Sequence, residues 1–521
     1  MNQKIAVPKD AAAVILLKDE KVLWARRNPE VKFLGGWHAF PGGKVEASDD
    51  ETSVKNCEDK ELEKFIVAAV RETFEEVGIL LVRNGDKLTK GQRASLHDDL
   101  ISGRNTLAEI LADWNLWIDA EDFFYTGFWT TPQFSPVRFK TRFFLAVCPP
   151  KQEPYAAISE LQTPEFIAPQ NALKRWTNSE VLISPPVLIS LQTLAAKEIK
   201  ENLNADSDES AQRKSEIDSK NQRLKNVSQI LLQKSRKFDG NIDYIELNSR
   251  IICLPLKTET LPPATHTNCF IVGRKKFVVI DAAARDENEQ NKFLALVDEL
   301  IKNGGVCREI IVSHHHRDHI GGERNLRKYL SEKYDMRVPV SAHYSTLKSA
   351  GDIKFEDFDK TLSDGDCFIL SDENGEEFKL EVLHAPGHAR GHLCFYDQEK
   401  GFLLSSDNVV GNGTVVIAPP EGNMSDYLKS LERMRNLPNL RFLCGSHGAA
   451  VFDARGKIKE YIAHRLEREK QVLEALKSGA KTPAEIVARV YPDLSSELFI
   501  PAEKTVSAHL EKLADEGNLR E

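Results

Sequence analysis

Ser313-His314-His315-His316-Arg317-Asp318-His319-Ile320-Gly321-Gly322 places four histidines and an aspartate within six residues. The stretch follows the apolar run Ile310-Ile311-Val312, which predicts a buried strand, and its two glycines can open a helix. A strand end presents side chains from a rigid edge, and alternation along an extended segment points His314 and His316 the same way. Asp318 and His319 then turn toward a second position. Imidazole and carboxylate are ligands that zinc prefers, so this stretch predicts half of a metal site; the alternative is a solvated, histidine-rich loop.

Further candidate ligands lie downstream, each in a predicted turn after a short apolar run. They are His388 in Ala385-Pro386-Gly387-His388, Asp407 in Leu403-Leu404-Ser405-Ser406-Asp407, and His447 in Cys444-Gly445-Ser446-His447-Gly448. Upstream, Asp281 ends the apolar run Phe277-Val278-Val279-Ile280. His388, Asp407 and His447 supply the remaining ligands of a metal site and favour it over a solvated loop.

Taken together, these motifs resemble the metallo-beta-lactamase hydrolase superfamily. The resemblance implies an αββα sandwich of two sheets faced by helices. It also implies that His314, His316 and His388 bind one zinc, that Asp318, His319 and His447 bind a second, and that Asp407 bridges the two. Zinc ions about 3.5 to 4 Å apart activate water and stabilise the oxyanion that its attack generates, so Asp318 and Asp407 are also expected to be catalytic. We expect His315, His384 and His392 to be non-ligands, because the ligand count is already filled.

Length and composition bound the class of protein. A chain of 521 residues with 41% hydrophobic content and a net charge of -9 predicts a soluble protein of several domains, without a basic bias toward nucleic acid. Eight cysteines are scattered singly, which indicates a reducing compartment, and we expect a cytoplasmic protein. The apolar run 11–17 is too short to span a membrane and reads as a first strand.

A second chemical centre is predicted near the N-terminus. Ala39-Phe40-Pro41-Gly42-Gly43-Lys44-Val45 precedes a helical stretch that ends Arg71-Glu72-Thr73-Phe74-Glu75-Glu76-Val77-Gly78. Glu72, Glu75 and Glu76 share one helical face at the i, i+3, i+4 spacing, and such a cluster repels itself unless a cation neutralises it. Hard oxygen ligands of this kind suit Mg²⁺ or Mn²⁺ bridging phosphate oxygens. A solvated acidic helix face is the alternative.

Coupled to the Gly-Gly loop, the glutamates resemble the Nudix box, in the branch that includes coenzyme A diphosphatases. The resemblance implies an α/β/α sandwich in which Arg71 orients Glu72, while Glu72, Glu75 and Glu76 hold the divalent metal. Arg71 and Glu72 are the expected catalytic residues, and Glu160 or Glu165 is a candidate further ligand. The sequence departs from the box in an insertion at 46–60 and at Thr73, where the family has an apolar residue. Glu63 occupies the offset from Arg71 expected of the first glutamate of the box.

We therefore expect an α/β and α+β multidomain protein. Its predicted parts are a Nudix domain (1–197), a polar linker (198–235) that buries too little surface to pack on its own, a metallo-beta-lactamase-fold domain (236–452) and a small winged-helix-like domain (453–521). The last contains His464-Arg465-x-x-Arg468-Glu469 and resembles the lactamase-like-protein-2 group, whose type member cleaves single-stranded RNA. Its acidic and basic residues nearly balance, so we favour a structural role, as a lid over the zinc cleft or a dimer contact. The oligomeric state is left open.

The predicted function is a bifunctional hydrolase. One site is expected to act on a nucleoside diphosphate derivative, and the dizinc site on single-stranded RNA or another phosphodiester, placed slightly ahead of a thioester such as acyl-coenzyme A. RNA needs basic or aromatic residues along a groove, and the candidates are Arg317, Arg390, His392 and Phe395. A binding or scaffold protein with a decayed Nudix site is the alternative from another class. No membrane partner is expected.

Overall fold

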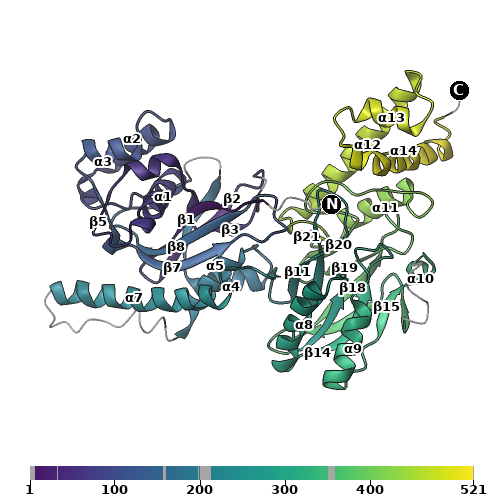
Figure 1. Cartoon of the computed structure of the whole chain (residues 1–521), viewed down its shortest axis with the longest axis horizontal. Helices are drawn as coiled ribbons and strands as arrows, with labels where there is room; N and C mark the ends of the chain where they lie inside the picture. The colour runs from purple at the N-terminus through teal and green to yellow at the C-terminus, as the bar shows by residue number, and fades with distance from the viewer. Residues whose placement is uncertain are drawn as a thin grey trace. The chain divides into compact units, whose positions relative to one another are not determined.

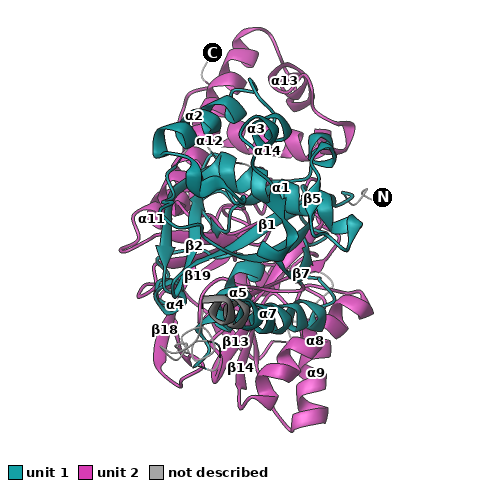
Figure 2. Cartoon of the chain, turned by 90° about the vertical axis from the view of Figure 1, so that its left-hand side faces the viewer, with its two compact units in different colours: residues 1–242 teal, residues 243–521 magenta. Residues whose placement is uncertain are grey.

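The computed structural model describes residues 6–31, 33–156, 160–197, 199, 213–349 and 358–519. It divides the chain into two compact units, residues 1–242 and 243–521 (Figure 2). Among the described residues, no helix combines the length and the apolar character that crossing a membrane requires.

The first unit is built on a mixed sheet with the strand order β3-β2-β1-β8-β7, in which β4 also pairs with β1 and β9 with β2 (Figure 1). The central strand β1 runs parallel to β8 along nine residue pairs. The strands are β1 (Lys9–Lys18), β2 (Lys21–Arg27), β3 (His38–Ala39), β4 (Gly42–Lys44), β7 (Phe124–Thr130), β8 (Phe139–Val147) and β9 (Leu161–Ile167), with a separate pair β5 (Val54–Lys55) and β6 (Ile118–Asp119).

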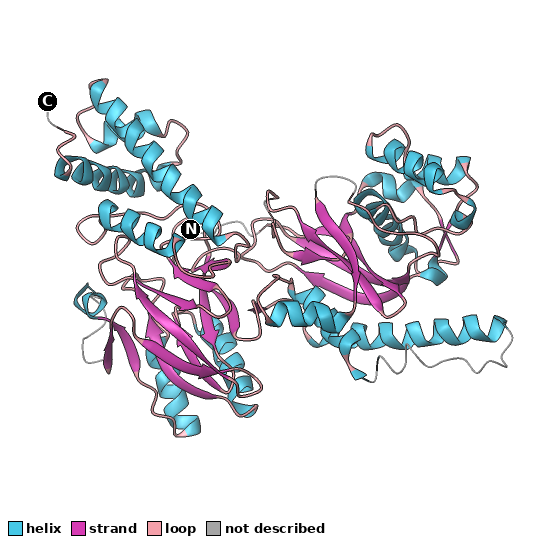
Figure 3. Cartoon of the chain, turned by 180° about the vertical axis from the view of Figure 1, so that it is seen from behind, coloured by secondary structure: helices cyan, strands magenta, loops and turns pink. Residues whose placement is uncertain are grey.

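Helices cover both faces of this sheet (Figure 3). One face packs on α1 (Lys60–Val77), α2 (Lys90–Ile101) and α3 (Leu107–Asp113), and the other on α4 (Pro169–Thr177), α5 (Pro185–Ala195) and α7 (Arg213–Lys237). Short 3-10 turns are η1 (Ala47–Glu51), η2 (Gly85–Lys87) and η3 (Ala120–Asp122). The helix α1 begins where Asp59 caps the amide of Glu61 and ends at Gly78, whose φ of 68° suits glycine.

Segment 198–235, which the sequence predicts to be a partly helical linker, contains most of α7. Leu224, Val227 and Leu231 of this helix are buried in the same core as α5. They recur at i, i+3 and i+7, which is one helical face. At Gly127 of β7, an added Cβ would lie 2.2 Å from the Ser235 hydroxyl, so the strand and the helix approach closely. The described second half of this segment is thus a helix that packs on the core of the first unit, although the segment was expected to bury too little surface to pack on its own.

In the second unit, twelve strands among the described residues form one hydrogen-bonded network. In the strand pairing of the described residues, the β10–β16 half and the β17–β21 half meet at the pair Lys276–Ser371. The strands are β10 (Ile245–Glu246), β11 (Ile251–Lys257), β12 (His266–Val272), β13 (Lys276–Ile280), β14 (Val306–Val312), β15 (Val340–His343), β16 (Lys360–Leu362), β17 (Cys367–Ser371), β18 (Glu377–His384), β19 (Leu393–Asp397), β20 (Phe402–Ser406) and β21 (Phe442–Gly445).

Each half of the network has its own helical cover. Side chains of α8 (Glu287–Lys302) and α9 (Glu323–Tyr334) share a core with β11–β15, whereas α11 (Met424–Arg435) and α12 (Ala454–Lys477) share one with β18–β21. The short helix α10 (Tyr344–Ser349) follows β15. The predicted mixed α/β multidomain architecture is confirmed.

The C-terminal region consists of α12, α13 (Pro483–Val490) and α14 (Ser496–Asp515), which enclose a small core of their own. Within the described part of the chain, which ends at residue 519, no strand follows α14. This region also contacts the larger domain, because Ala508 of α14 shares a core with α11 and α12.

Candidate metal centres

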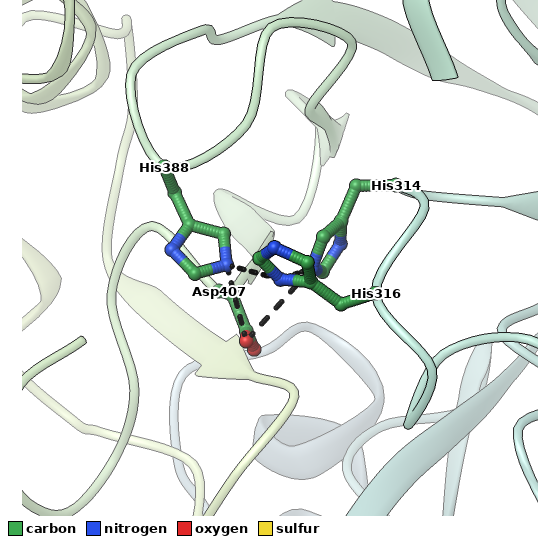
Figure 4. A group of neighbouring side chains, drawn as sticks. All are labelled: His314, His316, His388 and Asp407. Carbon is green, nitrogen blue, oxygen red and sulfur yellow. Dashed lines mark hydrogen bonds and ion pairs between the residues drawn. The ribbon is translucent and has the colours of Figure 1, made fainter. Parts of the chain in front are cut away.

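Four predicted ligands of the histidine-rich site converge at the ends of strands in the second unit. Among His314, His316, His388 and Asp407, one donor atom from each lies within 4.8 Å of all the others (Figure 4). His316 Nδ1 lies 3.0 Å from His314 Nε2 and 2.9 Å from His388 Nε2. His314 follows β14, His388 lies in the turn between β18 and β19, and Asp407 follows β20.

A second group consists of Asp318, His319 and His447. His447 Nε2 lies 3.5 Å from Asp318 Oδ2, and His319 Nε2 lies 3.9 Å from Asp318 Oδ1. The carboxylate of Asp407 faces both groups. It lies 3.6 Å from His388 Nε2 and 4.0 Å from His314 Nε2 on one side, and 3.5 Å from His319 Nε2 and 3.3 Å from His447 Nε2 on the other.

The second ring nitrogen of several histidines is held from outside. His388 Nδ1 lies 2.8 Å from the carbonyl oxygen of Val416, and His447 Nδ1 lies 2.8 Å from that of His266. His319 Nδ1 lies 2.8 Å from Asp281 Oδ2. Contacts of this kind orient the rings of metal-binding histidines and leave Nε2 for the metal. Asp281, which the sequence places at a strand end without a role in the site, thus positions His319.

The histidines of the two groups differ in the direction of their pKa shifts. Burial, together with the neighbouring histidines, holds the pKa of His314 well below its usual range. For His447, burial opposes protonation, but Asp407 and Asp318 raise its pKa to about 10. The same balance of burial against carboxylates raises the pKa of His319 well above its usual range. The carboxylates therefore stabilise positive charge at the second group. A divalent cation can take the place of the protons on His319 and His447.

The donor set fits divalent cations. Borderline metals such as zinc take imidazole nitrogen and carboxylate oxygen, and both groups offer only these. His319 Nε2 is buried and has no hydrogen-bond partner among the described residues. A buried polar atom without a partner is costly, and a cation at this position would satisfy it.

The three remaining histidines of this region have other surroundings. His392 is fully buried, and its Nε2 accepts the backbone N–H of Asp407 at 3.1 Å. His384 Nε2 lies 2.8 Å from the carbonyl oxygen of Arg390, and its ring stacks on His343. His315 is outside both groups of donors. His392 thus supports the backbone of Asp407.

In the first unit, Arg71 lies at the centre of the predicted Nudix residues. Its Nη1 donates to Glu72 at 2.9 Å and to Glu75 at 3.1 Å. Glu76 accepts the N–H of Gly42 at 2.8 Å, which ties the helix α1 to the Gly-Gly loop. Among the described residues, no choice of one oxygen from each of the three carboxylates brings all three within 4.8 Å of one another.

The insertion contributes a residue that the sequence reasoning missed. Asp49, in η1, is buried and accepts two hydrogen bonds from Arg71, at 2.8 Å from Nε and 3.0 Å from Nη2. Glu63, at the offset expected of the first glutamate, instead binds Lys60 and the N–H of Val54. The available signal was the group of acidic residues at the start of the insertion, which includes Asp49.

Burial of the glutamates raises their pKa values. The pKa of Glu72 is raised to about 7 by burial, and those of Glu75 and Glu76 are also raised by it. At Gly43, an added Cβ would lie 2.5 Å from the Glu72 carboxylate, so a larger residue here would displace that carboxylate. Clustered, desolvated carboxylates favour a bound cation, because it stabilises their ionised form. The donor chemistry therefore fits Mg²⁺ or Mn²⁺.

Other predicted Nudix features are also placed. Thr73 is buried and its hydroxyl donates to the carbonyl oxygen of Ala69 at 2.7 Å, so its polar group is satisfied within α1. Glu160 lies 3.9 Å from Arg27, and its charge raises the pKa of Glu76. Glu165 binds Arg175 and the Trp24 indole. Of the two candidate extra ligands, Glu160 is the one that acts on the glutamate cluster.

Known families cover most of the chain. Residues 7–180 match the NUDIX domain, residues 262–447 match the metallo-beta-lactamase superfamily, and residues 482–521 match the beta-lactamase associated winged helix domain.

Several curated relatives align with about half of the chain. A lactamase-like protein of Aspergillus niger is 30% identical over 265 residues, which is 48% of this chain and 75% of that protein. A beta-lactamase-like protein 2 homolog of Caenorhabditis elegans is 27% identical, over 48% of this chain and 79% of its own length. An atrochrysone carboxyl ACP thioesterase of Pseudocercospora fijiensis is 26% identical, over 49% of this chain and 71% of its own length. Among solved structures, a NUDIX hydrolase from Alicyclobacillus acidocaldarius is 30% identical, covers 37% of this chain and 92% of its own, and has a TM-score of 0.32.

Proposed function

Since the chain belongs to the metallo-beta-lactamase superfamily and carries a NUDIX domain ahead of that domain, we propose that it is a hydrolase with two separate metal centres. The observation that carries the proposal is the position of Asp407. Its carboxylate lies within 4.0 Å of histidines from both groups of donors. One carboxylate shared by two sets of histidines is the arrangement that a two-metal centre needs.

In this proposal His314, His316 and His388 hold one zinc, Asp318, His319 and His447 hold the other, and Asp407 contacts both. Zinc bound there would supply an activated water near neutral pH and positive charge for a developing oxyanion. Asp281 orients His319, and His392 supports the backbone of Asp407. Asp318 and Asp407, the proposed catalytic carboxylates, supply the negative charge that holds the cations.

For the substrate of this centre we favour a thioester over RNA. Of the four residues considered for RNA, His392 and Phe395 are fully buried, and Arg390 donates to the carbonyl oxygen of Pro420. Stacking and phosphate contacts need accessible side chains, and among these four that leaves the exposed Arg317 and Arg390, of which Arg390 is already bound to Pro420. Relatives named as acyl carrier protein thioesterases support a thioester. This reverses the order expected from the sequence.

For the NUDIX centre we propose hydrolysis of a nucleoside diphosphate derivative of the coenzyme A type. Glu72, Glu75 and Glu76 would hold Mg²⁺ or Mn²⁺, which supplies charge to the diphosphate oxygens. Arg71 keeps the carboxylates of Glu72 and Glu75 in place through hydrogen bonds to both. Asp49 fixes Arg71 in turn.

A substrate test separates these possibilities. Protein with Glu75→Gln installed would receive acyl-coenzyme A and single-stranded RNA in parallel, with zinc, at low and high salt. We expect thioester hydrolysis that varies little with salt and is lost in His388→Ala. Salt-sensitive cleavage of RNA alone, also lost in His388→Ala, would overturn the thioester proposal. Hydrolysis of neither substrate, with no zinc bound, would overturn the histidine centre itself.

A further inference from the structure

The loop 408–420, which follows Asp407, contacts the histidine centre on one side and the C-terminal helices on the other. It contains no regular helix or strand, so tertiary contacts must position its backbone. On one side, the carbonyl oxygen of Val416 lies 2.8 Å from Nδ1 of His388. This contact leaves Nε2 of His388 facing Asp407 and His316.

On its other side, the same loop is bound by side chains of α12 and α14. Arg465 Nη2 donates to the carbonyl oxygen of Val415, and the N–H of Ile417 donates to Thr505 Oγ1 at 3.3 Å. Tyr461 donates to the carbonyl oxygen of Gly413 at 2.7 Å. The residues before and after Val416 are therefore both held by the C-terminal helices.

Arg465 is an unusual residue for a purely structural contact. Its side chain is 2% exposed, and no carboxylate forms an ion pair with it among the described residues. Its guanidinium lies 5.4 Å from the centre of the Tyr427 ring, and its Nε has no hydrogen-bond partner in the described part of the chain. Burying a charge without an ionic partner is costly.

Two other residues of the motif His464-Arg465-x-x-Arg468-Glu469 bind the C-terminal helices and not the loop. Arg468 binds Gln471 and the carbonyl oxygen of Val490, and Glu469 binds Lys512 and lies 3.3 Å from His509. These contacts hold the three C-terminal helices together. Within His464-Arg465-x-x-Arg468-Glu469, Arg465 is thus the side chain that hydrogen-bonds to the loop.

We propose that Arg465 and Thr505 are positioning residues for His388, which they orient through the backbone of Val415–Ile417. The C-terminal helices then set the metal affinity of the centre on its His314, His316 and His388 side. This inference rests on the proposed role of His388 as a metal ligand. It gives the winged-helix region a function that needs no nucleic acid.

The test measures metal binding by the full-length protein. Arg465→Met removes the donor and the charge but keeps an unbranched side chain, and Thr505→Val keeps the shape of the residue. Arg468→Met is the matched control, because it makes the same change on the same helix without a hydrogen bond to the loop. Zinc content would be measured after dialysis against a graded chelator, and the visible absorption of Co²⁺-loaded protein would report the coordination geometry.

We expect two ions per chain in the wild type and in Arg468→Met. Arg465→Met and Thr505→Val should bind one of the two ions about 10- to 100-fold more weakly, with an altered Co²⁺ band, and Arg465→Lys should restore part of the affinity. Thr505→Val carries the test if Arg465→Met does not fold. If His388→Ala loses one ion while both variants bind two with wild-type affinity and spectrum, the inference is overturned. If His388→Ala keeps both ions, the ligand assignment is overturned, and the inference with it.

Discussion

The buried carboxylate of Asp49 accepts two hydrogen bonds from the guanidinium of Arg71, although 22 residues separate them in the chain. Arg71 in turn binds Glu72 and Glu75, so Asp49 anchors the donor that holds both glutamates. The side chains of Asp49 and Arg71 are 1% and 8% exposed. Without Asp49, Arg71 keeps its ion pairs with Glu72 and Glu75, but its Nε loses its acceptor.

Asp49→Asn should therefore destabilise the first unit by about 1–3 kcal/mol and lower diphosphate hydrolysis. Chemical denaturation followed by circular dichroism measures the first effect. Asp50→Asn is the matched control, because its side chain is exposed in the same turn, and it should change stability by less than about 0.5 kcal/mol. Equal effects of the two substitutions would contradict the anchoring role.

Glu75→Gln should reduce diphosphate hydrolysis roughly 100-fold or more, because it removes a charged ligand from the proposed Mg²⁺ site. Thioester hydrolysis at the histidine centre should stay unchanged. Steady-state rates with Mg²⁺ and zinc supplied separately measure both activities. Glu61→Gln, on an exposed position of the same helix, should leave both rates unchanged. An unaltered diphosphatase rate in Glu75→Gln would remove the proposed NUDIX activity.

The stability of the metal-free protein should depend on pH through His447. Although burial opposes it, Asp407 and Asp318 raise the pKa of His447 to about 10, whereas an unfolded histidine titrates near about 6.5. The protonated side chain therefore contributes stability that is fully present below pH 6.5 and is lost as the pH rises through about 10.

The melting temperature of chelator-treated protein should therefore fall more steeply between about pH 6.5 and 10 than that of zinc-loaded protein, because in the zinc-loaded protein a metal ion takes the place of the proton. The difference should shrink in His447→Gln. Parallel pH profiles for chelated and zinc-loaded protein would argue against metal binding at His447.

Val227→Asp should destabilise the first unit by roughly 3 kcal/mol or more, because it places a charge in the core beneath α7. Val227 is fully buried, whereas Lys225 on the same helix is exposed. Lys225→Asp introduces the same side chain on the opposite face and should leave the unfolding midpoint nearly unchanged. Similar midpoints for both variants would indicate that α7 contributes no packing energy.

The sequence alone determined the identity of the two hydrolase families and the order of their motifs. His314, His316, Asp318 and His319 lie within six residues, and the glutamates of α1 lie within five. Such local spacing carries its chemistry directly, because neighbouring residues on one strand end or helix face must lie together.

Only the tertiary structure decided which partners complete these motifs. Asp49 rather than Glu63 binds Arg71, and α7 packs in the core of the first unit. Arg465 binds the carbonyl oxygen of Val415, next to the Val416 carbonyl that contacts His388. Each of these contacts joins segments that are far apart in the chain. The contacts of the loop are also made by backbone carbonyl oxygens, and because every residue has one, no residue type marks them in the sequence. Long-range packing therefore determined what no local pattern of residue types encodes.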